Sequence, residues 1–250
     1  MNIKTETMGS ITGNVPSELN RGRPSLRSVV FVALAVWFGL VSFLASQGAF
    51  VAGAGSPPLP IFLGLAIPLA VFLAAYFGWS LFREFILGAD LRFVTAIQAW
   101  RWAGQFFFWL YAWRVLPGLL AFPAGVGDMA IGVTAPWMVL GLVRDPSFAA
   151  SRRYVIWNIL GILDFVVAVS MGVLSSGLFH GINGLIGNVT SSAMDRLPLA
   201  LVPAFVVPFF TMLHLTALFQ ARELARAGKS SSFRGATDVN NTWKSYRECV

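Results

Sequence analysis

One arginine stands inside a largely apolar run of this sequence, where a charged side chain can bind a ligand or take part in proton transfer. Arg101 is separated from Arg92 by eight residues and from Arg114 by twelve, whereas a helix that crosses about 30 Å of hydrocarbon needs roughly twenty residues. If Arg92 and Arg114 mark the two ends of such a helix, Arg101 lies about 13 Å inside it. We expect a charge at this depth to face other helices or a water-filled cavity.

Two glutamines share the face of this arginine in an α-helix. At roughly 100° per residue, Gln98, Arg101 and Gln105 project within an arc of about 60°, which predicts a polar stripe inside a helix bundle. An alternative interpretation is that Arg101 extends toward the lipid headgroups while both glutamines hydrogen-bond to neighbouring helices.

Asp164 supplies a negative charge at a similar depth in a later apolar run. It follows Arg153 by eleven residues, which places it about 16 Å into a helix that starts there. Asn158, Gly161 and Asp164 fall within an arc of about 120°, so two polar side chains and a small residue share one face. We expect the carboxylate either to pair with Arg101 or to take up a proton. In an alternative register the helix begins after Asp164 and leaves it at the cytoplasmic surface.

A histidine lies in the last apolar run. His214 precedes Ala221 by seven residues, so its depth resembles that of Arg101. A histidine here can hydrogen-bond between helices or carry a proton toward the cytoplasm.

Arg114 and Asp128 form a second candidate pair, near the outer ends of two consecutive helices. Turns at residues 116–118 and 122–124 could fold the intervening segment back and join the two side chains. Such a pair would either fasten the outer loop or gate a substrate path.

Motifs of known enzymes and cofactor sites are absent from the sequence. It contains no Gly-x-Ser-Gly, no H-E-x-x-H and no P-loop. Residues 125–130 fit a relaxed dinucleotide fingerprint, but an apolar run follows and no strand precedes them. Cys249 is the only cysteine, which excludes intrachain disulfides and multi-cysteine metal sites. We therefore predict no cofactor and no metal, and favour a protein that is not an enzyme.

The elements that carry these residues must be membrane helices. Of the 250 residues, 56 % are hydrophobic and 12 % are charged, and the mean hydropathy is +0.70, which excludes soluble and fibrous classes. The net charge of +7 does not indicate nucleic acid here, because the basic residues flank apolar runs. The partner that composition predicts is the lipid bilayer.

Six apolar runs define the predicted fold, an all-α integral membrane bundle. The predicted spans are residues 28–51, 60–82, 93–113, 124–143, 154–176 and 197–221. Internal prolines occur in the even-numbered spans (Pro68, Pro136, Pro203 and Pro208), which predicts kinks there. Residues 1–27 form a disordered cytoplasmic tail, and residues 222–250 form a helix end and a second disordered tail. The connections 114–123 and 177–196 are apolar enough to lie in the outer interface.

The distribution of lysine and arginine sets the orientation. Fifteen fall on the side of the termini, two (Arg114 and Arg196) fall on the other, and Arg101 lies within a span. This asymmetry predicts a multi-pass protein of the cell membrane, of the bacterial inner-membrane type, with both termini in the cytoplasm. An alternative is that the first span is a signal peptide cleaved near residues 52–54.

Three functions fit a polar cluster of Arg101, Gln98, Gln105, Asn158, Asp164 and His214. The first is a transporter of a small solute or proton, which predicts a water-accessible cavity that reaches the cluster. The alternatives are a membrane enzyme acting on a lipid or lipophilic substrate, with a lateral opening beside a base, and a non-catalytic accessory subunit whose cluster is dry and fully paired.

Overall fold

The computed structural model describes residues 26–53, 56–176, 178 and 189–248, and every regular element within these ranges is helical. The predicted tail within residues 1–25, most of the connection 177–196 and Cys249 lie outside the described residues. Among the described residues, five helices are long and apolar enough to cross a membrane. They are Leu26–Ser46 (α1), Leu59–Gly78 (α2), Gly118–Arg144 (α6), Arg152–Leu174 (α7) and Val202–Ala227 at the start of the last helix. This composition and length agree with a membrane protein of several apolar helices.

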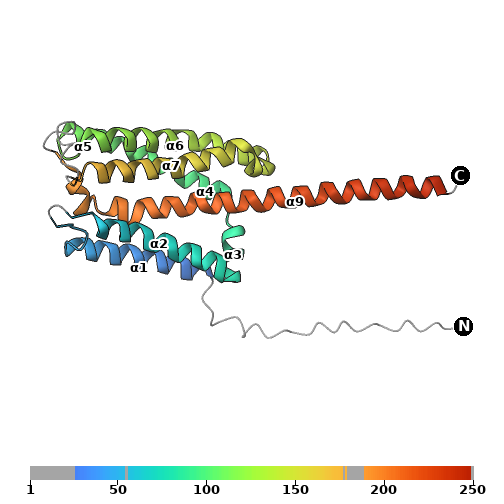
Figure 1. Cartoon of the computed structure of the whole chain (residues 1–250), viewed down its shortest axis with the longest axis horizontal. Coiled ribbons are helices and arrows are strands. Elements are labelled where there is room, and N and C mark those ends of the chain that lie inside the picture. The colour runs from blue at the N-terminus through green and yellow to red at the C-terminus, as the bar shows by residue number, and fades with distance from the viewer. Residues whose placement is uncertain (1–25, 54–55, 177, 179–188, 249–250) are drawn as a thin grey trace, which may run out of the picture.

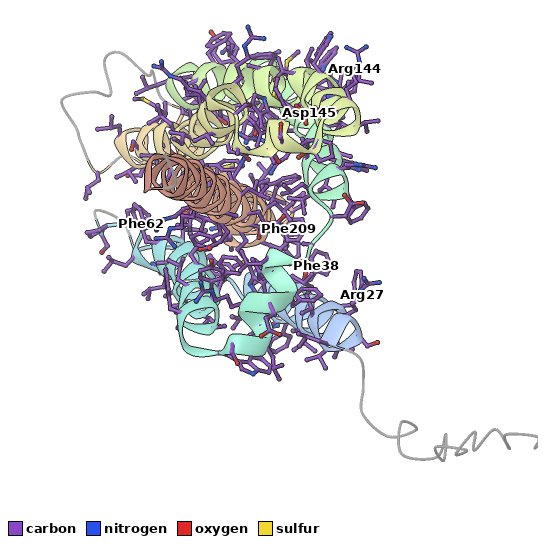
Figure 2. The ribbon with its side chains drawn as sticks, turned by 90° about the vertical axis from the view of Figure 1, so that its right-hand side faces the viewer. Arg27, Phe38, Phe62, Arg144, Asp145 and Phe209 are labelled. Carbon is purple, nitrogen blue, oxygen red and sulfur yellow. The ribbon has the colours of Figure 1, made fainter. Side chains whose placement is uncertain are left out.

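The last helix, α9 (Val207–Glu248), lies between two groups of helices (Figure 1). On one side are α1, α2 and the short α3 (Ser80–Leu87). On the other are α4 (Leu91–Ile97), α5 (Phe106–Ala112), α6 and α7. The view along the helices shows the same order, with α9 in the middle (Figure 2). Residues from both groups therefore face α9.

The third predicted span is not one continuous α-helix. It consists of α4 (Leu91–Ile97), the 3-10 helix η2 (Gln98–Gln105) and α5 (Phe106–Ala112). A 3-10 helix rises about 2.0 Å per residue against about 1.5 Å in an α-helix, so the three pieces together extend for about 37 Å. That length exceeds the hydrocarbon thickness of about 30 Å.

The 3-10 geometry changes which side chains of this segment share a face. Side chains three residues apart are aligned in a 3-10 helix, and the buried residues of η2 are Gln98, Arg101 and Gly104. Gln105, which the α-helical period places on this face, is instead partly exposed. The predicted stripe of Gln98, Arg101 and Gln105 is therefore wrong at Gln105, because the 3-10 helix has fewer residues per turn than the α-helix on which the prediction was based.

Helix α6 begins earlier than the sequence predicts. It starts at Gly118 and contains Pro123 and Pro136, so the predicted outer connection 114–123 shrinks to the turn before Gly118. Leu116 and Pro117 in this turn are almost completely buried. The earlier start places Asp128 ten residues into α6, about 15 Å from its first turn.

The last helix starts with an irregular turn. Residues Val202–Val206 (η6) form a π-helix that contains Pro203 and packs against α2 and α1. Gly64 of α2 lies against Ala204, so two small residues let the helices approach closely. Pro68 and Pro203 both lie within helical segments, and the kinks predicted for the even-numbered spans stay a prediction. Helix α9 continues to Glu248, well past residue 226.

Candidate functional site

Arg101 of η2 binds two carboxylates at once. Its Nε donates to Oδ1 of Asp128 at 2.7 Å, and its Nη2 donates to Oδ2 of Asp164. The arginine side chain is 1 % exposed, and those of Asp128 and Asp164 are 17 % and 10 % exposed. The three groups therefore form a buried ion-pair cluster contributed by η2, α6 and α7.

The remaining nitrogen of Arg101 reaches two acceptors. Nη1 donates to the carbonyl oxygen of Gly161 at 3.2 Å and lies 3.0 Å from Nε2 of His214. The guanidinium carbon lies 3.9 Å from the ring centroid of Phe165, a cation–π arrangement. Every side-chain nitrogen of Arg101 is thus engaged within the cluster.

The contacts of His214 fix its protonation and tautomer. Arginine can only donate, so Nε2 of His214 accepts the bond from Arg101 and carries no proton. Nδ1 then holds the proton and donates it to Oδ1 of Asn158 at 2.9 Å. The Nδ2 of Asn158 donates in turn to the carbonyl oxygen of Tyr154 at 2.9 Å, which is consistent with this assignment. His214 is neutral, and both ring nitrogens are occupied.

The polar contacts continue toward the start of α7. The hydroxyl of Tyr154 lies 2.7 Å from that of Thr95 of α4, and both side chains are almost fully buried. Gln98, one turn further along, donates to the carbonyl oxygen of Phe210 at 3.4 Å. These bonds join α4 and η2 to α7 and α9 around the cluster.

Four glycines make room for the cluster and for η2. A methyl group on Gly127 would overlap the Asp164 carboxylate, and one on Gly161 would overlap the ring of His214. Gly132 of α6 lies directly against the backbone of η2 at residues 101 and 102, and Gly104 of η2 lies directly against Cβ of Asp128. Only a residue without a side chain allows these approaches.

The charges of the cluster do not balance if both carboxylates are ionised. One guanidinium faces two carboxylates, and His214 is neutral, so the sum is one negative charge. An uncompensated charge in apolar surroundings is unfavourable. The cluster is therefore arranged to accept one more positive charge.

The structure assembles most of the residues that the sequence singles out. Arg101 and Asp164 form the expected ion pair, and Asn158 and His214 join it through hydrogen bonds. Gln98 is buried next to the cluster, and its Oε1 has no hydrogen-bond partner among the described residues. Gln105 does not take part.

The predicted pairing of Arg114 with Asp128 is wrong. Asp128 binds Arg101 instead, while Arg114 is exposed in the turn before α6, with a φ of 56°. The error comes from the predicted start of this helix at residue 124, which would leave Asp128 at its outer end, beside Arg114. The helix starts at Gly118 instead. The absence of any charge between residues 114 and 128 is the signal that could have placed Asp128 deeper.

An elongated pocket ends at the cluster. It runs along α7 from Phe165 and past the end of this helix to Ser176, with α2 and η6 on one side and α6 on the other. Its empty volume is about 790 Å³ when the space open to the outside is counted. Asp128 lies at its inner end. The side chains between the two ends are almost entirely apolar, and they include Ile61, Phe62, Phe107, Ala168, Val169 and Val206.

The other end of the pocket is polar. Ser176, Ser191 and Asp195 line it, and the Ser191 hydroxyl donates to the carbonyl oxygen of Gly172 at 2.7 Å. Burial raises the pKa of the Asp195 carboxyl above its ordinary value, and the positive charge of Arg196 opposes part of this shift. The pocket thus has an apolar body with a carboxyl group at each end.

Comparison with known proteins gives one family. Residues 58–222, about two thirds of the chain, match the domain of unknown function DUF8737. Neither the curated proteins nor the solved structures contain a match. The matched region runs from the start of α2 into α9, and so it includes the whole ion-pair cluster and every residue that lines the pocket. The chain that builds this site therefore belongs to the DUF8737 family.

Proposed function

We propose that the protein is a multi-pass protein of a bacterial inner membrane that binds a lipophilic molecule within the bilayer and carries it. In this proposal α4, η2 and α5 together form the third of six spans, and both termini are cytoplasmic. The length of the three pieces, about 37 Å at the rises of the two helix types, supports the third span. The positions of the basic residues support the orientation.

The pocket is the observation that carries the proposal. Its long, apolar lining suits a hydrocarbon or aromatic body, and its inner end presents a carboxyl group to a polar head. A small hydrophilic solute would need polar groups along its path, whereas the middle of this pocket offers apolar side chains. The ligand is therefore better described as lipophilic than as a small polar solute.

The geometry favours binding and transport over catalysis. Within the cluster only Asp128 lines the pocket, and both ring nitrogens of His214 are already bonded. A general base must reach the proton that it abstracts, and His214 does not face the pocket. An accessory subunit is the weaker alternative, because the cluster adjoins an open space.

A photoreactive probe tests the proposal. The full chain in nanodiscs is exposed to a long-chain alcohol that carries a diazirine, and labelled peptides are located by mass spectrometry. We expect labels in residues 165–176 and at the start of α2. Val169→Trp, which fills the pocket, should reduce this labelling several-fold.

The control variant is Val166→Trp on the same helix. Val166 is 56 % exposed and does not line the pocket, so this change adds equal bulk without filling the site. Equal labelling of both variants would contradict the proposal.

A further inference from the structure

The charged groups around the pocket are of one sign. Among the described residues that line it, Asp128 and Asp195 are the charged ones, and both are acidic. Phe62 and Phe107 add aromatic rings, whose faces attract cations, whereas the ring of Phe165 already carries the Arg101 guanidinium. An apolar cavity with carboxyl groups and aromatic rings suits an organic cation with a large apolar body.

The cluster behind Asp128 has a place for one positive charge. Arg101 neutralises one of the two carboxylates that it binds, and the neutral His214 neutralises neither. Two occupants restore electrical neutrality: a proton on the carboxyl pair, or a cationic group in the pocket beside Asp128. They are alternatives, because both together would leave an excess positive charge in apolar surroundings.

We propose, on the basis of the pocket function above, that the lipophilic ligand is an organic cation and that it binds beside Asp128 in exchange for one proton of the Asp128–Asp164 pair. The O–H bond of the protonated carboxyl breaks, the proton passes to water, and the charge of the ligand takes its place. The cluster with its occupant is neutral before and after the exchange. Such an exchange couples movement of a lipophilic cation to movement of a proton in the opposite direction.

The groups that face the carboxyl pair define this balance. Arg101 approaches from η2, and His214 from α9 contacts Arg101. The packed face of α5 contributes the apolar Phe107, and α2 contributes apolar residues to the pocket wall. Asp195 stands at the opposite end of the pocket and lies outside the pair. Within the described residues, the proton count is therefore set by Arg101 and the two carboxyls.

The test compares two probes of the same shape and opposite charge. Tetraphenylphosphonium and tetraphenylborate are titrated separately into the full chain in phosphatidylcholine nanodiscs, with empty nanodiscs as background. A pH dye in weakly buffered solution counts the released protons. We expect binding of the cation only, release of up to one proton per cation, and affinity that weakens by up to roughly tenfold per pH unit as the pH falls.

Variants locate the exchange. Asp128→Asn should weaken binding of the cation at least tenfold, and Asp164→Asn should abolish proton release, because the remaining carboxylate is already paired with Arg101. Asp145→Asn is the matched control. Asp145 is exposed and caps η3 (Pro146–Ala150) far from the pocket, and asparagine caps equally well, so binding should not change.

Three results would overturn the inference. They are equal binding of both probes, binding of the cation without proton release, and loss of proton release in Asp195→Asn but not in Asp164→Asn. If Asp128→Asn does not fold, the inference is still tested by two measurements on the unmodified protein: its preference for the cation over the anion, and the number of protons released per cation bound. Diazirine labelling that persists under any of these results would preserve the lipophilic pocket and reject only the cation exchange.

Discussion

Arg101 is held by directional bonds from all three of its side-chain nitrogens, and this determines how the site responds to substitution. Two carboxylates, a carbonyl oxygen and an imidazole nitrogen surround one planar group. A lysine would keep the charge but concentrate it on one nitrogen. The arrangement therefore depends on the shape of the guanidinium as well as on its charge.

The first prediction concerns the two carboxylates. Asp128→Asn or Asp164→Asn alone leaves Arg101 with one carboxylate, so each variant should lose little stability. The double variant leaves a buried, unpaired arginine and should lose about 3 to 5 kcal/mol, more than the sum of the single changes. Unfolding of the purified protein in mixed micelles of increasing SDS content would measure this difference. Additive effects of the two changes would show that the carboxylates do not share Arg101.

The second prediction concerns the contact of α7 with His214. Gly161→Ala places a methyl group into the imidazole ring and should lower stability by about 1 to 3 kcal/mol through overpacking. Gly172→Ala on the same helix is the control, because its methyl group would meet only Leu120, at 3.9 Å. Thermal unfolding of both variants tests the contact, and a Gly161→Ala protein as stable as the control would refute it.

Part of the site could be predicted from single residues. The depths of Arg101 and Asp164 follow from Arg92 and Arg153, which lie at the starts of α4 and α7. The two depths are similar enough to predict the ion pair. Asp128 is harder to place, because its depth depends on where α6 starts, and the signal for the early start is only the lack of charge between residues 114 and 128. Gly127 and Gly161 indicate small-residue packing, but the sequence does not show which side chain each one admits.

At the scale of elements, η2 is the feature that sequence periodicity could not reveal. Gln98 and Arg101 fit both an α-helical and a 3-10 repeat. The two repeats differ in the next buried residue, which is Gln105 in an α-helix and Gly104 in a 3-10 helix. The choice is made by packing, because η2 lies directly against the glycines of α6. The apolar helices themselves were predictable, since long runs without charge have few other solutions.

The third prediction tests the period of this segment. In an α-helix that buries Gln98 and Arg101, position 105 would be buried too, whereas η2 leaves Trp102 and Gln105 at least partly exposed. Nitroxide labels on single cysteines at positions 102 and 105, in a Cys249→Ser background, should collide with oxygen in the bilayer. Labels at Trp100, which is 75 % exposed, and at Gln98, which is 1 % exposed, provide the two reference values. Protection at position 105 equal to that at position 98 would favour an α-helix.

At the scale of the whole molecule, the lone cysteine offers a direct test of orientation. Cys249 is predicted to lie in the cytoplasm, because the basic residues gather on the side of both termini. In intact bacterial cells a membrane-impermeant maleimide should not label it, and labelling should appear after the cells are opened. Ser56→Cys, in the connection between α1 and α2, is the complementary variant in a Cys249→Ser background. The maleimide should label this cysteine already in intact cells. Labelling of Cys249 in intact cells would overturn the orientation.

The glycine contacts between η2 and α6 also have a mechanical consequence. Gly104 lies against Asp128, and Gly132 lies against the backbone of Trp102, so the two segments interlock at points on successive turns. Sliding one along the other would force backbone atoms into each other, and such interfaces move as units. A motion that moves α2 away from α6 and α7 would widen the pocket and leave this contact between η2 and α6 in place. The ion pairs of Arg101 with Asp128 and Asp164 would stay intact during that motion.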